Sequence, residues 1–435
     1  MRRIRSLAAG IALVALVATG CGWQIEVVDG AGGGGGRTTA DVGSDVAMVG
    51  SHAFYYDATN GNLRHAYYTV AGWQHEVLDG AGGSNGRIDA DVGSGVSGMF
   101  DDTTLRVFYY DATNGNLRQG YFAGGVWHFE TIDGQGGAGG RVDADVGMEN
   151  TATTQLRMID PLDPWSVERV LNVYYPDSEN GDLRLATYSE GAWDFETLDG
   201  AGGSNGRIDA DVGESVSVLD ELFTFHWEVF YYDATNGDLR YGRYDIGTGT
   251  WEFRTLDGSG GGSGRVDGDV GSDVSATSHS SGPAVFYYDA TNGNLRSATW
   301  NGSDFVLTTL DGAGGGAGRI SSDVGSAPDV VFSGFSDEPL RVFYYDAGNR
   351  DLRVGVHNGG PSLKSGWTFE AVDGRLGNIG ATTNDVGSNS AGALIQRPGD
   401  YIDWGPQDPH VLYYDRTKGE LRHAWKGCKI GGCAG

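Results

Sequence analysis

The sequence has few cysteines, few prolines and few basic residues for its length. It holds 3 cysteines and 10 prolines among 435 residues, which excludes a disulfide framework and a proline-rich stalk. Lys and Arg total 30 against 58 Asp and Glu, and the net charge of −28 argues against nucleic acid as a partner because phosphates are repelled. No long apolar run follows residue 20, so contact with a membrane is expected only through an N-terminal anchor.

Glycine is the abundant residue, with 75 copies. These glycines follow no three-residue period, which excludes collagen. Hydrophobic residues make up 39% of the chain and aromatic residues 11%, so the chain can bury a core and is not expected to be disordered.

Residues 1–20 are predicted to be a signal peptide. Three arginines within the first five residues precede an apolar run over 7–19, which is too short to span a bilayer. The following segment ends at Cys21 and resembles the bacterial lipobox, although Ala18 occupies the position where leucine is usual. A lipoprotein modified at Cys21 and exposed at the bacterial cell envelope or surface is expected. Ordinary secretion with cleavage nearby, or an uncleaved anchor, are the alternatives.

Two motifs each occur seven times in the rest of the chain. An Asp-Gly motif, with an aromatic residue six positions upstream, has its aspartate at Asp29, Asp79, Asp133, Asp199, Asp257, Asp311 and Asp373. A Tyr-Tyr-Asp…Leu-Arg motif ends at Arg64, Arg118, Arg184, Arg240, Arg296, Arg353 and Arg422. Spacings of 50 to 66 residues between repeats are typical of a β-propeller.

Each repeat contains four strand-like runs and no helical period. Asn-Gly turns such as Asn114-Gly115 favour a tight hairpin between the third and fourth runs, because both residues accept positive φ. The sequence therefore predicts an all-β, seven-bladed β-propeller over residues 21–427, with four antiparallel strands per blade. Its Asp-Val-Gly runs, rich in small residues, are assigned to the innermost strands. Because the chain starts with an outermost strand at Trp23, that strand should pair with the last blade and close the ring.

The glycine-rich loops carry several acids, for which two interpretations compete. In the first, the aspartates accept hydrogen bonds from glycine N–H groups or pair with Arg87 and Arg118. In the second, they bind calcium, which prefers several oxygen ligands. The candidate calcium ligands are Asp79, Asp89, Asp91, Asp133, Asp143, Asp145, Asp199, Asp209 and Asp211. A structural ion pair or backbone clamp is the expected role of the repeated Leu-Arg arginine.

The opposite face is expected to carry the inserts in which the repeats differ. They cover 148–169, 220–227 and 393–409 and hold the isolated aromatics Trp165, Trp227, Tyr401 and Trp404. Such loops either recognise a ligand or cover the blade ends.

The segment from Arg106 to Arg118 resembles the blade core of fungal and bacterial fucose-binding lectins, which are propellers. In that family a leading arginine, a glutamate after Ile-Arg and a nearby tryptophan hold the sugar between blades. The resemblance implies ligand-binding roles for Arg106, Arg341, Trp127 and Trp367. The glutamate position is occupied here by other residues, including His65 and His423.

No catalytic motif is found: there is no His-Glu-x-x-His, no P-loop and no nucleophile elbow, since Gly-x-Ser-x-Gly at 82–86 and 202–206 stands in glycine-rich loops that no helical pattern follows. A non-catalytic, lectin-like binding protein, monomeric and without a cofactor other than calcium, is expected. The alternatives are a protein-interaction scaffold that uses the variable loops and, less favoured, a glycan-acting hydrolase. In the tail, 428–435, Cys428 and Cys433 are predicted to form a disulfide, since four intervening residues with two glycines can form a turn.

Overall fold

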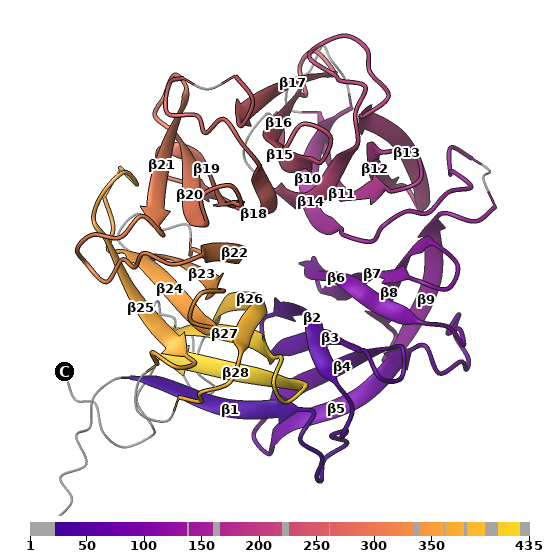
Figure 1. Ribbon diagram of the computed structural model, residues 1–435. Coiled ribbons are helices and arrows are strands. Elements are labelled where there is room, and N and C mark those ends of the chain that lie inside the picture. Colours follow the sequence, from indigo (N-terminus) through magenta and orange to yellow (C-terminus); the bar gives the residue numbers. More distant parts are fainter. Residues whose placement is uncertain are drawn as a thin grey trace, which may run out of the picture.

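The computed structural model describes residues 22–136, 139–159, 166–219, 226–260, 262–333, 339–360, 362–377, 381–395 and 408–426. These residues form 28 strands, and among them no helix is long and apolar enough to cross a membrane. The strands make seven four-stranded antiparallel sheets, arranged as blades of a ring (Figure 1). The predicted signal peptide, Cys21, Cys428, Cys433, Trp165, Tyr401 and Trp404 lie outside the described residues.

Blades are numbered along the chain, each from its innermost strand outward. Blade 1 contains β2 (Val42–Val49), β3 (His52–Asp57), β4 (Asn62–Thr69) and β5 (Gly72–Asp79). Blade 2 contains β6 (Val92–Asp101), β7 (Thr104–Asp111), β8 (Asn116–Ala123) and β9 (Val126–Asp133). Blade 3 contains β10 (Thr151–Met158), β11 (Val167–Asp177), β12 (Asp182–Ser189) and β13 (Ala192–Asp199). Blade 4 contains β14 (Val212–Val218), β15 (His226–Asp233), β16 (Asp238–Asp245) and β17 (Thr250–Asp257).

The remaining blades follow the same order. Blade 5 contains β18 (Val270–His279), β19 (Gly282–Asp289), β20 (Asn294–Trp300) and β21 (Phe305–Asp311). Blade 6 contains β22 (Val324–Val331), β23 (Leu340–Asp346), β24 (Asp351–His357) and β25 (Trp367–Asp373). Blade 7 contains β26 (Val386–Ile395), β27 (Asp408–Asp415), β28 (Glu420–Lys426) and, as its outermost strand, β1 (Trp23–Asp29).

The ring closes through β1, as the sequence predicted. Trp23 pairs with Lys426 and Glu26 with His423 in an antiparallel register, so the two ends of the described chain share one sheet (Figure 1). The predicted all-β fold, the seven blades and the closure are therefore confirmed.

Blades are held together by apolar clusters that each span two neighbours. On β3, Phe54 packs toward blade 2 and the next residue, Tyr55, packs toward blade 7, and neither side chain is exposed. Successive strand residues point to opposite faces, and here both faces are covered. This explains why the second strand of each blade reads as a continuous apolar run rather than an alternating one.

A β-bulge ends the outermost strand of every blade. In blade 1, Leu63 pairs with Asp79 while Arg64 pairs with Val77, so Leu78 is the extra residue. The same irregularity precedes each Asp-Gly aspartate. Because a bulge re-aims the side chains beside it, Leu78 and Asp79 are both buried.

Candidate functional site at the blade junctions

The Asp79 carboxylate is the centre of a junction between blades 1 and 2. Its Oδ1 accepts the backbone N–H groups of Gly80 at 2.9 Å and Ile88 at 2.7 Å. Its Oδ2 accepts the Tyr109 hydroxyl at 2.6 Å and lies 3.0 Å from Nη2 of Arg118, both from blade 2. Asp79 is fully buried, so these four donors replace its hydration.

Arg118 completes this junction by clamping the glycine-rich loop. Its Nη2 also donates to the carbonyl of Gly86 at 2.8 Å, and its Nη1 donates to the Thr131 hydroxyl at 2.9 Å. Burial, followed by the negative charge of Asp79, raises the pKa of Tyr109 well above its ordinary value, so Tyr109 stays a hydrogen-bond donor. The expected structural role of the Leu-Arg arginine is confirmed.

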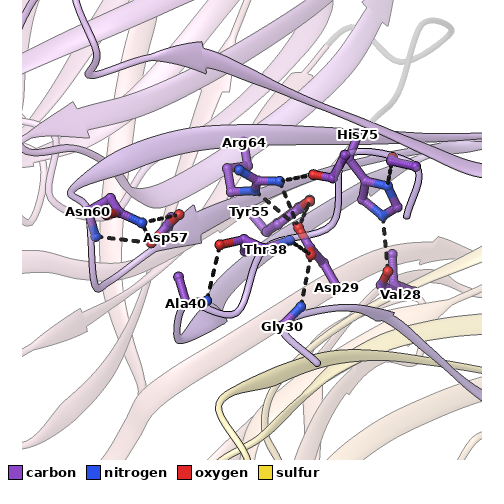
Figure 2. Close-up of polar contacts among 12 residues, drawn as sticks. Val28, Asp29, Gly30, Thr38, Ala40, Tyr55, Asp57, Asn60, Arg64 and His75 are labelled. Atoms are coloured by element: carbon purple, nitrogen blue, oxygen red, sulfur yellow. Dashed lines mark hydrogen bonds and ion pairs between the residues drawn. The ribbon is translucent and has the colours of Figure 1, made fainter. Parts of the chain in front are cut away.

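At all seven junctions the Asp-Gly aspartate meets a tyrosine and an arginine of the next blade, although at the junction of blades 6 and 7 Arg422 lies closer to Asp415 of its own blade, at 2.8 Å. Figure 2 shows this arrangement in the copy in which Tyr55 and Arg64 of blade 1 hold Asp29 of blade 7. We call it the aspartate latch. The nitrogen–oxygen distances are 3.0 Å for Asp29–Arg64, 3.0 Å for Asp79–Arg118, 3.2 Å for Asp133–Arg184, 2.9 Å for Asp199–Arg240, 3.0 Å for Asp257–Arg296, 3.4 Å for Asp311–Arg353 and 3.5 Å for Asp373–Arg422.

Two further sets of acids hold the turns of the same face. Asp57 accepts the backbone N–H of Asn60 at 3.0 Å and orders the Asn-Gly turn (Figure 2). Asp91, at the start of blade 2, accepts the hydroxyl of Tyr56 from blade 1 at 2.7 Å. These repeated aspartates therefore accept hydrogen bonds from donor groups of the protein itself.

The candidate calcium ligands fall into three groups in the structure. Asp79, Asp133 and Asp199 are buried in latches, and both oxygens of each are engaged. Asp91 and Asp145 accept tyrosine hydroxyls, and the backbone N–H of Asp211 donates to Thr235. Asp89, Asp143 and Asp209 are exposed and are the carboxylates left for a cation. No group of three or more metal-ligating side chains suited to a metal occurs among the described residues, and calcium binding stays a prediction.

The four candidate ligand-binding residues do not come together in one place. Arg106 is 12% exposed and already donates to Asp101 at 3.0 Å and Gln119 at 3.1 Å. Arg341 donates to the carbonyl of Pro339 at 3.2 Å. Trp367 is buried, and its indole N–H donates to the carbonyl of Leu363 at 2.7 Å.

The fourth candidate, Trp127, lines a pocket between blades 1 and 2. The pocket has a volume of about 510 Å³, and blade 1 contributes His52, Tyr67 and Glu76 to it. The half-buried Trp127 indole packs edge-on against His65, with ring centroids 5.6 Å apart. Aromatic faces and polar groups are thus combined in one concave site.

A chain of hydrogen bonds runs through the wall of this pocket. His65 Nδ1 lies 2.9 Å from Glu76 Oε1, and His65 Nε2 lies 2.9 Å from His52 Nδ1. When both imidazoles are neutral, the carboxylate accepts from His65 Nδ1, His65 Nε2 accepts and His52 Nδ1 donates. The remaining ring nitrogen of His52, Nε2, is then an acceptor on the pocket side.

Electrostatics keep His52 neutral and Glu76 ionised near neutral pH. Burial, followed by the charge on His65, lowers the pKa of His52 to about 4. The hydrogen bond from His65 lowers the pKa of Glu76, and a hydrogen bond from Trp127 adds to the effect. The pocket therefore presents an anionic carboxylate and a neutral imidazole.

Sequence reasoning missed this histidine pair, although a signal was present. His52 and His65 are 13 residues apart, and Glu76 follows 11 residues later. The spacing predicts contact between these residues only when the register of the hairpins is known. In that register Phe54 pairs with His65, and His65 pairs with Glu76.

The innermost strands surround a second cavity, of about 240 Å³, on the ring axis. Each blade contributes two adjacent residues to it, and three of the seven contribute an acid: Asp45, Glu149 and Asp273. Glu149 accepts the backbone N–H of Ser215 at 2.6 Å, and Asp273 accepts that of Ala327 at 3.2 Å. Burial raises the pKa of Asp45 to about 6 and that of Glu149 to about 7.

Comparison with known proteins gives a fold likeness. The WD40 domain of coronin from Toxoplasma gondii is similar, with a TM-score of 0.49 and 10% sequence identity over 95% of this chain and 89% of that chain. No protein-family model and no curated protein matches the chain.

Proposed function

We propose that this propeller is a non-catalytic binding protein of lectin-like type, whose carbohydrate ligand occupies the pocket between blades 1 and 2. The observation that supports this is the combination of the half-buried Trp127 indole, the Glu76 carboxylate and the His52 imidazole in one pocket of about 510 Å³. The apolar face of a sugar stacks on an indole, while its hydroxyls donate to such acceptors.

The rim of the pocket suits a neutral, amphipathic ligand. Phe122 lines it and is 43% exposed, and Val126 beside it is 46% exposed. Arg87 and Asn85 of the glycine-rich loop lie at the other end and supply N–H donors. Export, with lipid attachment at Cys21, and calcium at the exposed acids belong to the same proposal.

A protein ligand is the second candidate, and the exposed aromatics near the pocket favour it. Tyr67, which lines the pocket, is 36% exposed and Phe100 is 46% exposed, and Phe100 packs edge-on against His52 at 6.2 Å. Co-purification of one partner protein that is lost in Phe100→Ser, with no glycan bound, would support this candidate instead.

A glycan array, probed with and without calcium, tests the carbohydrate proposal. The wild-type protein is expected to bind a defined set of glycans, and Trp127→Ala should weaken that binding roughly tenfold or more, which corresponds to about 1.4 kcal/mol. Phe305→Ala is the matched control, because Phe305 is the equivalent half-buried aromatic of blade 5. Binding that survives Trp127→Ala, or no glycan binding by the wild type, would overturn the proposal.

A further inference from the structure

A second hydrogen-bonded histidine pair lies at the closure of the ring. His410 Nδ1 is 2.8 Å from His423 Nε2, and His423 Nδ1 is 3.0 Å from Glu26 Oε1. The indole N–H of Trp73 donates to the same carboxylate oxygen at 2.9 Å. Blade 7 supplies the histidines and the glutamate, and blade 1 supplies the tryptophan.

This closure cluster, formed by Glu26, Trp73, His410, His423 and Trp425, repeats the composition of the pocket between blades 1 and 2. His410 and His423 are again 13 residues apart and occupy the positions of His52 and His65. Trp425 occupies the position of Tyr67 and stacks on His423, with ring centroids 5.0 Å apart. The pocket and the closure cluster thus both contain a glutamate, a histidine pair, an aromatic stack and a tryptophan from the next blade.

The histidine pair is not part of the repeated framework, although the tryptophan–glutamate contact recurs, for example between Trp23 and Glu370 at 3.0 Å. The aspartate latch occurs at all seven junctions, whereas the histidine pair occurs in blades 7 and 1 only. At the same two positions blade 2 has Arg106 and Gln119, and blade 5 has Ala284 and Ser297. The full combination is therefore confined to two neighbouring blades.

The Glu26 carboxylate is suited to accept from a ligand. Both of its donors, His423 and Trp73, bond to Oε1, and no described residue donates to Oε2. The side chain is 36% exposed. Burial raises its pKa, but the hydrogen bonds from His423 and Trp73 outweigh burial, so the pKa of Glu26 lies below its ordinary value and the group is an anion at neutral pH.

We propose that the closure cluster is a second binding site for the same class of ligand, a neutral saccharide that stacks on Trp73 and donates a hydroxyl to Glu26. This inference rests on the proposed function of the first pocket. Glu26 lies on β1, whereas Trp73 lies on β5, so a bound sugar touches both the N-terminal strand and blade 1. Occupation of the site therefore stabilises the closed ring.

Isothermal titration of the purified protein counts the sites, with the methyl glycosides of fucose, galactose, mannose and N-acetylglucosamine as probes. One of these sugars is expected to bind with two molecules per chain. Trp127→Ala and Glu26→Gln should each leave one molecule per chain, the double variant should bind none, and Phe305→Ala should still bind two. In the Trp127→Ala protein, saturating sugar should still raise the melting temperature, and Glu26→Gln should remove that shift.

The outcomes separate this inference from the proposed function. One molecule per chain, lost in Trp127→Ala and unaffected by Glu26→Gln, overturns the second site and leaves the first in place. No binding of any of the four probes to the wild type overturns both. If the Glu26→Gln protein without sugar melts at a lower temperature than the wild type, the substitution has impaired folding. The number of bound sugar molecules is then measured on Trp73→Phe, which keeps an aromatic face.

Discussion

The guanidinium of Arg118 lies 3.0 Å from the carboxylate of Asp79 in the neighbouring blade, and 39 residues of sequence separate the two. Their side chains are 4% and 0% exposed, so this ion pair is shielded from solvent. Such a pair stabilises only while both members are present, because a single buried charge keeps its desolvation cost.

Arg118→Ala should therefore lower the free energy of unfolding by about 3–5 kcal/mol. The Asp79 carboxylate would keep two backbone donors and Tyr109 but lose its counter-charge. Urea unfolding measures the change, and Arg243→Ala, at an exposed arginine of blade 4, is the control with an expected change within about 0.5 kcal/mol. Equal losses for the two variants would show that the latch contributes nothing.

Gly86→Ala should be strongly destabilising. A Cβ at Gly86 would lie 1.9 Å from the carbonyl oxygen of Phe129, and its φ is +85°. We expect a loss of roughly 3 kcal/mol or more, from steric overlap with a backbone atom and the left-handed conformation together. Gly124→Ala isolates the second effect, since Gly124 has φ +62° and nothing within 4 Å, and should cost about 1 kcal/mol. Similar losses in the two proteins would contradict the role assigned to the overlap.

Asp329→Asn should stabilise the protein at alkaline pH. Part of the Asp329 surface is exposed to solvent, but many protein atoms surround the side chain. This burial raises the pKa of Asp329 to about 7. The folded state thus holds a proton that the unfolded state releases near pH 4, so the stability of the wild type decreases as pH rises from about 4 to 7. Asparagine has no such loss and keeps an acceptor for the N–H of Gly392. Thermal melts at pH 8 should favour the variant by on the order of 2 kcal/mol, and the difference should vanish below pH 4.

The histidine chain predicts an unusual titration of His52. Its pKa is lowered to about 4, so the folded state binds fewer protons than an unfolded chain with a value near 6.5. This group contributes stability above pH 6.5 that is lost as the pH falls toward 4. Proton NMR of the folded protein should show the His52 ring titrating near pH 4, and the same ring in urea near 6.5. A folded-state midpoint at 6 or higher would contradict the lowered pKa that burial gives His52.

Trp127 and His65 show how far sequence alone could go. Local patterns were enough to predict the blades, their number and the closure of the ring. These patterns are the seven repeats, their Asn-Gly turns and the start of the chain with an outermost strand at Trp23. Trp127 was selected by resemblance. Its neighbour His65 was seen only as a departure from a motif, because its partners His52 and Glu76 are set by the register of two hairpins.

The acids of the ring axis were beyond sequence analysis for a different reason. Asp45 and Gly95 belong to different repeats and meet only when the innermost strands are brought round one axis. A repeat alignment compares equivalent positions, and these two positions are equivalent. In such an alignment Asp45 and Gly95 therefore fall in the same column and look like sequence variation, although they contact each other in the structure.

Parity limits how this inner ring can be built. Acceptors Asp45, Glu149 and Asp273 stand in blades 1, 3 and 5, and their donors Gly95, Ser215 and Ala327 stand in blades 2, 4 and 6, all with positive φ. Seven is odd, so Asn389 of blade 7 is the member left over, and it falls beside the closure. Deleting two consecutive blades, such as 1 and 2, would conserve every remaining pair. Deleting blade 2 alone would set the acid of blade 1 against the acid of blade 3, so these three contacts tie the blades together in twos.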